Sequence, residues 1–266
     1  MATSWSGRWI GELALLERQV LGRRRPPAEL AVREALAICG GGVWCTRCGR
    51  GLEGRDHERA RGASGRAPRC VRCAQAPAFD GFVRLGRYAP PLDALVRNVK
   101  ARGWHDVAEA LGLALAREID RRLQRPANGW IVTPVPTPFV RRVIRGIDHA
   151  QVIAAATAVE LGARLAPLLR APLHAPRQAA LGRSERLQRH RRMGVRGCPA
   201  RLQGASVIVI DDVRTTGGTL QKVRELLKMA GAAAVVPAVI CVAEQSQVNE
   251  SDGFEAAEAE AGAPAP

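Results

Sequence analysis

The stretch "VIVIDDVRTTGGTL", residues 207–220, joins an apolar run to two adjacent acids and then to a corner rich in threonine and glycine. Four apolar residues in a row are typical of a strand buried inside a sheet, and the residues after the corner have helical periodicity. Ligands of open α/β sheets bind beyond the carboxyl ends of such strands. The stretch therefore predicts a strand, a ligand-binding corner and a helix, in that order.

The corner has the chemistry of a phosphate site. Glycine lets backbone N–H groups approach a ligand closely, threonine hydroxyls add donors, and the start of a helix favours an anion. The carboxylates of Asp211 and Asp212 would repel a phosphate, so ribose hydroxyls or a hydrated Mg²⁺ are their expected partners. The alternative is an ordinary turn in which Asp and Thr only cap the helix.

Strand and helix patterns alternate on both sides of this corner, which predicts an α/β fold with a mainly parallel sheet flanked by helices. Strands are expected in the ranges 82–88, 129–136, 163–170, 205–211 and 232–243. Helices are expected in the ranges 90–123, with a break near Gly103, 148–162 and 218–231.

Four of the seven cysteines form two Cys-x₂-Cys pairs, Cys45 with Cys48 and Cys70 with Cys73. Two such pairs supply four thiolates with no open position, which is the ligand set of a structural Zn²⁺. His57 lies between the pairs and is an alternative ligand, and Cys39 is either a fifth candidate or a leftover cysteine.

These patterns divide the chain into an N-terminal helical extension (1–38), a zinc ribbon (39–80), the α/β domain (81–243) and a disordered acidic tail (244–266). The extension carries an apolar stripe from Trp5 to Val20, which either docks on the body or binds a partner. The tail contains no Lys or Arg and ends in Ala and Pro.

The formal net charge of +15 favours nucleic acid, phosphate ligands or an acidic partner, although a coding bias toward arginine and alanine would also produce it. Aromatic residues make up only 4% of the chain, which weakens a stacking platform for single-stranded DNA. The first twenty residues do not resemble a signal peptide, and no apolar run is long enough to span a membrane. We therefore expect a reduced, cytoplasmic protein.

The corner resembles the 5-phosphoribosyl-1-diphosphate (PRPP) motif of type I phosphoribosyltransferases. The resemblance implies that Asp211 and Asp212 are the catalytic acids and contact the ribose 2′- and 3′-hydroxyls. It also implies that the next loop holds the 5′-phosphate, through Thr215, Thr216, Gly217, Gly218 and Thr219. Arg214 stands where the family usually has an apolar residue.

The wider sequence is similar to the ComF branch of this family, which consists of competence-associated proteins with an N-terminal zinc ribbon. The stretches that carry this similarity are "CTRCG…CVRC" (45–73), "YAPPLDALVRNVKARG" (88–103), "IVTPVPTPFVRRVIRG" (131–146), "RQAALGRSER" (177–186) and the corner. Where the family usually has "RGFNQ", this chain reads "RGIDHAQ" at 145–151.

The resemblance implies further site residues. The loop after "TPVP" would bind the diphosphate through Pro136 and Thr137, with Lys100 and Arg145 either neutralising its charge or lying on the surface as solvated bases. Residues 172–195 would form a lid. Its arginines would contact diphosphate or DNA, or remain in solvent.

Two functions follow from the resemblance. The first is Mg²⁺-dependent phosphoribosyl transfer from PRPP or a related sugar phosphate, with release of diphosphate. The second is a non-catalytic accessory protein that senses PRPP or a nucleotide and binds single-stranded DNA or a DNA-uptake helicase during natural competence. Both include a structural Zn²⁺, and the first adds Mg²⁺ with PRPP.

Overall fold

The computed structural model describes residues 27–52, 68–70, 73, 79, 81–123, 127, 129–145, 147–171, 193–196 and 202–243. The apolar stripe predicted at 5–20, His57, the acidic tail and the lid before Met193 lie outside the described residues.

The described helices and strands follow the predicted alternation. The helices are α2 (Ala28–Cys39), α5 (Leu92–Arg102), α6 (His105–Leu123), α7 (Phe139–Arg145), α8 (His149–Glu160) and α10 (Gly218–Met229). The strands are β1 (Val83–Arg87), β2 (Ile131–Pro134), β3 (Arg164–Leu165), β4 (Leu169–Arg170), β5 (Gly194–Val195), β6 (Ser206–Arg214) and β7 (Ala234–Val242).

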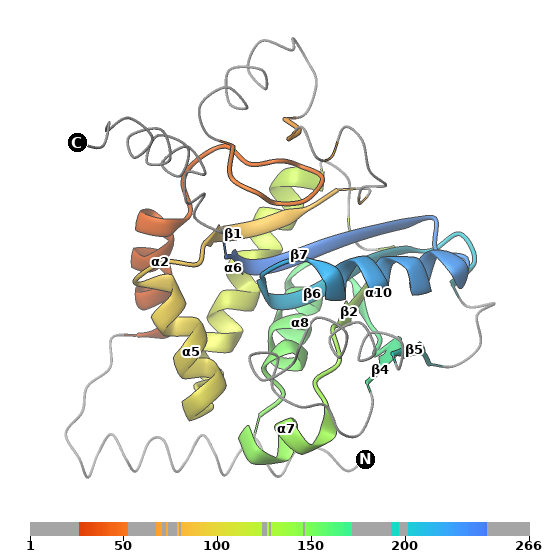
Figure 1. Cartoon of the computed structure of the whole chain (residues 1–266). Coiled ribbons are helices and arrows are strands. Elements are labelled where there is room, and N and C mark those ends of the chain that lie inside the picture. The colour runs from red at the N-terminus through yellow and green to blue at the C-terminus, as the bar shows by residue number, and fades with distance from the viewer. Residues whose placement is uncertain are drawn as a thin grey trace, which may run out of the picture.

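Five strands form one sheet in the order β1-β7-β6-β2-β3, and every pairing in it is parallel. Strand β6 is the middle strand, so its carboxyl end lies at the centre of one sheet edge (Figure 1). The predicted α/β class, with a mainly parallel sheet flanked by helices, is confirmed.

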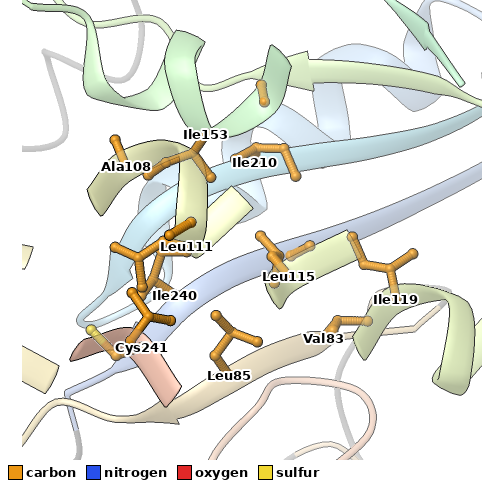
Figure 2. Close-up of a cluster of buried hydrophobic side chains, with 14 of the residues drawn as sticks. Val83, Leu85, Ala108, Leu111, Leu115, Ile119, Ile153, Ile210, Ile240 and Cys241 are labelled. Atoms are coloured by element: carbon orange, nitrogen blue, oxygen red, sulfur yellow. The ribbon is translucent and has the colours of Figure 1, made fainter. Parts of the chain in front are cut away.

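Side-chain alternation along β6 divides the core between the two faces of the sheet. Ile208 and Ile210 belong to a cluster with residues of α2, α6 and α8, whereas Val207 and Val209 pack with residues of α10. Figure 2 shows the first cluster, in which Leu111 and Leu115 of α6 lie over the strands. Burial on both faces explains why the sequence of this strand is a continuous apolar run.

Strand β6 is longer than the sequence predicts, because it continues past the two acids to Arg214. Its register with β7 persists through Val213, which pairs with Cys241, and Arg214, which pairs with Val242. Asp211 and Asp212 therefore lie within β6, near its carboxyl end. The corner begins only at Thr215.

The predicted strand at 163–170 is instead two short strands that belong to different sheets. Strand β3 pairs with β2, whereas β4 pairs antiparallel with β5. Pro167 lies between them and has no N–H group to donate to a continuous ladder. The short helix α7 was not predicted.

Helix α2 is part of the main core, because Val32, Ala35 and Cys39 are buried in the same cluster as β1 and α6. The helix begins directly after Pro27, whose ψ angle of 137° is not helical. Among the helices that the structure describes, none has the length and apolarity needed to cross a membrane.

Candidate functional site

The two acids at the end of β6 lie at the edge of the sheet where the parallel strands end. Strand β2 ends beside β6 at this edge, and Val135 extends their ladder by donating its N–H to the carbonyl of Ile210 at 2.8 Å. The loop 135–138 therefore leaves the sheet beside Ile210, whereas β6 continues to Arg214 before the loop 215–217 begins. The predicted diphosphate loop and the predicted phosphate loop thus both follow strands that end at the edge of the sheet carrying the acid pair.

Asp212 is buried and is surrounded by groups that favour its ionised form. The Lys100 amine of α5 lies 2.7 Å from its Oδ2 atom, and Nε2 of His149, the first residue of α8, lies 2.9 Å from the same oxygen. The backbone N–H of Val213 donates to Oδ1 at 2.6 Å. Burial opposes ionisation, but the His149 and Lys100 contacts outweigh it and hold the pKa of Asp212 below its usual range.

Asp211 has a different environment, although it is the next residue. It is half-buried, and its Oδ1 atom accepts a hydrogen bond from the backbone N–H of Asp212 at 2.9 Å. Burial, followed by repulsion from the Asp212 carboxylate, raises the pKa of Asp211 above its usual range. The pair therefore combines one carboxylate that stays charged with one that gains a proton readily, as expected for adjacent acids.

The loop 215–219 presents exposed backbone at the start of α10. Thr215, Thr216 and Gly218 are exposed, and the helix begins at Gly218. Gly217 has φ +84°, a left-handed conformation that side chains other than glycine adopt at a cost. The N–H groups of the first helical turn have no carbonyl partner within the helix, so this end can bind an anion.

The loop 135–138 is tied to α8 through a single aspartate. Asp148 accepts a hydrogen bond from the Thr137 hydroxyl at 3.2 Å and caps α8 by accepting one from the backbone of Gln151 at 3.4 Å. Arg142 of α7 lies 3.8 Å from its other carboxylate oxygen. Asp148 therefore fixes the loop relative to the helix that carries His149.

The four predicted cysteine ligands lie together, with all their Sγ atoms within 4.8 Å of one another. The Sγ atoms of Cys48 and Cys70 are 3.7 Å apart, close to the ~3.8 Å that tetrahedral Zn–S bonds of about 2.3 Å require. The N–H and hydroxyl of Thr46 both donate to the carbonyl of Pro68, which joins the two pairs. The cluster fits a metal such as zinc and is consistent with a zinc ribbon.

Cys39 does not belong to this cluster. Its Sγ atom lies 3.4 Å from the carbonyl oxygens of Ala89 and Pro90, at the end of α2 in the main core. It is therefore a buried thiol of the α/β domain.

A family model described as the phosphoribosyl transferase domain matches residues 109–256, which is more than half of the chain and includes the acid pair. The chain belongs to this family. It is 29% identical to the DNA utilization protein YhgH of Salmonella typhi over 180 residues, or 65% of this chain and 77% of that protein. It is 27% identical to Competence protein F of Haemophilus influenzae over 170 residues, or 62% of this chain and 74% of that protein.

Among solved structures, the glutamine PRPP amidotransferase of B. subtilis is 23% identical, with a TM-score of 0.34. The match covers 50% of this chain and 26% of that chain, so this chain spans about a quarter of the amidotransferase. The resemblance to the ComF branch is confirmed by the family match together with the two named relatives.

The phosphoribosyl transferase domain brings most of the predicted site residues to one edge of its sheet. Asp211, Asp212 and the range 215–219 lie at the end of β6, and Pro136 and Thr137 lie at the end of β2. Lys100 also reaches this edge, but its amine contacts Asp212. Arg145 ends α7, and its side chain lies outside the described part of the chain.

Sequence reasoning missed His149 as a member of this site. Its only signal was its place in "RGIDHAQ", where the ComF pattern usually lacks histidine. The side chain is 6% exposed, and its Nδ1 atom is buried with no hydrogen-bond partner among the described residues. His149 therefore places a buried nitrogen without a hydrogen-bond partner in the described structure beside the acid pair.

Proposed function

We propose that this chain binds PRPP at the carboxyl edge of its sheet and transfers the phosphoribosyl group to an acceptor with release of diphosphate. The observation that carries the proposal is the acid pair at the end of β6, directly before the loop 215–219 at the start of α10. This arrangement lies inside the region matched by the phosphoribosyl transferase family. It offers acceptors for ribose hydroxyls and donors for a phosphate at adjacent positions.

Each part of the edge has one role in this proposal. Asp211 and Asp212 accept hydrogen bonds from the ribose 2′- and 3′-hydroxyls, and the loop 215–219 holds the 5′-phosphate. Pro136 and Thr137 shape the diphosphate site, with the side chains of Lys100 and Arg145 as its cations. Mg²⁺ enters with PRPP and neutralises the diphosphate.

The reaction exchanges one bond at C1 of the ribose for another. The C1–O bond to diphosphate breaks, and its electron pair leaves with the diphosphate oxygen. A lone pair of the acceptor forms the new bond to C1, and any proton lost by the acceptor passes to solvent. The protein contributes by positioning the reactants and by stabilising charge on the leaving group.

The four-cysteine module has a structural role in the same proposal. We propose the domain division 1–38, 39–80, 81–243 and 244–266, with α2 and Cys39 packed on the third unit and Zn²⁺ held by Cys45, Cys48, Cys70 and Cys73 of the second. Bound metal supplies the folding free energy of such modules. Thiolate ligands fit the reducing cytoplasm, which is where we place the protein.

The test of catalysis is diphosphate release from PRPP during a screen of nitrogen and oxygen acceptors. The expected result is release that requires one acceptor class and Mg²⁺, and that falls by orders of magnitude in Asp211→Asn/Asp212→Asn. No acceptor-dependent release by a protein that binds PRPP would contradict a transferase and favour the second function.

The second candidate function is a non-catalytic accessory role in DNA uptake. The names of two relatives, DNA utilization protein and Competence protein F, favour it, as does the net charge of +15. The partner would be single-stranded DNA or a DNA-uptake helicase. The test is transformation of a strain that lacks the gene: rescue by Asp211→Asn/Asp212→Asn would favour this function, and failure of that folded variant would favour catalysis.

A further inference from the structure

Arg214, the last residue of β6, lies against the phosphate loop. A Cβ atom added to Gly217 would lie 3.1 Å from Nε and 3.5 Å from Nη2 of Arg214. The guanidinium group therefore fills the space beside the one left-handed residue of the loop. Position 217 therefore favours glycine for two reasons: a Cβ atom would crowd the Arg214 side chain, and the φ angle is positive.

The charge of Arg214 has no acid to balance it in the described part of the chain. Its side chain is half-buried, and its ring contact is a cation–π interaction with Phe82, 6.0 Å from the ring centroid. An arginine fork matches the geometry of phosphate oxygens and forms charge-assisted hydrogen bonds with them. A phosphate bound in the adjacent loop would therefore suit this guanidinium.

Phe82 is itself fixed from the other side by the cysteine module. A Cβ atom on Gly49 would overlap Cε1 of Phe82, so the ring lies directly on the backbone of the turn that follows Cys48. The carbonyl of Gly49 accepts a hydrogen bond from Nη1 of Arg84 at 2.9 Å, which ties this turn to β1. Packing therefore runs from the cysteine module through Phe82 to Arg214.

We propose that Arg214 binds the phosphate group seated in the loop 215–219, and that Phe82, backed by Gly49, holds the guanidinium in place. This inference rests on the proposed PRPP site and adds a residue that the family pattern does not supply. It also gives the cysteine module a part in ligand binding, through packing alone.

The test is calorimetric titration of PRPP, ribose 5-phosphate and inorganic diphosphate into wild type, Arg214→Leu and Arg214→Lys. Loss of charge-assisted hydrogen bonds predicts roughly tenfold or greater weakening of PRPP and ribose 5-phosphate by Arg214→Leu, and a smaller loss for Arg214→Lys. Diphosphate, which has no 5′-phosphate, should bind the variants as it binds wild type.

Two further variants complete the test. Phe82→Leu removes the ring under the guanidinium and should weaken ribose 5-phosphate by a few-fold. Arg117→Leu removes a charge from α6, where Arg117 is 72% exposed and pairs with Glu160, and should bind as wild type. Circular dichroism and zinc content establish that each variant is folded.

The outcomes separate this inference from the proposed function. If Arg214→Leu binds ribose 5-phosphate with wild-type affinity, the role of Arg214 is overturned. The proposed PRPP site is not contradicted by that result. Equal weakening of all three ligands would also overturn the role of Arg214, because the effect would not belong to the 5′-phosphate. A wild type that binds no PRPP would overturn the proposed function itself.

Discussion

The Nε2 atom of His149 lies 2.9 Å from Oδ2 of Asp212, so the first residue of α8 contacts the acid pair at the end of β6. Lys100 reaches the same oxygen from α5. Asp212 is therefore held between two helices that pack on one face of the sheet. This arrangement stabilises a buried carboxylate at the position where we propose that ribose binds.

His149→Ala should lower the free energy of unfolding by about 1–3 kcal/mol, because Asp212 stays buried and loses a partner. Urea denaturation measures this change. The matched control is His105→Ala, since His105 is about half exposed and lies 3.4 Å from Glu109; its loss should cost at most about 1 kcal/mol. Equal effects of the two substitutions would contradict the role given to His149.

Asp211 should make the folded state less stable as pH rises. Its pKa is raised in the folded protein, so above the usual carboxyl range the folded state retains a proton that the unfolded state has lost. Asp212 acts in the opposite direction: its lowered pKa gives stability above the usual carboxyl range that is lost as pH falls.

Urea denaturation at several pH values between about pH 5 and pH 9 tests this effect of Asp211 on the free energy of unfolding. The difference in stability between Asp211→Asn and wild type should shift in favour of the variant as pH increases. A difference that stays constant across this range would show that Asp211 has an ordinary pKa in the folded state.

These acids also show how far the sequence alone predicts the site. The order of elements, the loop before α10 and the position of the acid pair follow from local patterns, because alternation, glycine and capping residues act over a few positions. The contacts of Lys100 and His149 with Asp212 join three separate elements, and no local spacing encodes them. The length of β6 was missed for the same reason, since pairing with β7 extends it.

Gly217→Ala should weaken ribose 5-phosphate binding by tenfold or more, because the methyl group both strains the loop and meets the Arg214 side chain. The matched control is Gly162→Ala. Gly162 also has a positive φ angle, +61°, but a methyl group there would contact nothing within 4 Å. Both variants should lose about 1–2 kcal/mol of stability, and only Gly217→Ala should lose the ligand. Unchanged binding in a folded Gly217→Ala would contradict the proposal that the loop 215–219 binds the 5′-phosphate.

One zinc ion should bind per chain through the four clustered thiols. Cys45→Ser should reduce the zinc content, measured by atomic emission, to near zero and destabilise the module. Cys39→Ser is the matched control: Cys39 is buried in the main core, so it should lose stability but keep the metal. Zinc loss in both variants, or in neither, would contradict this assignment.

We propose that the edge of the sheet at Asp211 and Asp212 binds PRPP. Calorimetric titration of PRPP into the zinc-loaded protein, with and without Mg²⁺, tests it most directly when Asp211→Asn/Asp212→Asn is titrated in parallel. We expect Mg²⁺-dependent binding to the wild type that the double variant loses while remaining folded. Absence of binding to the folded wild type, or equal binding by the double variant, would contradict it.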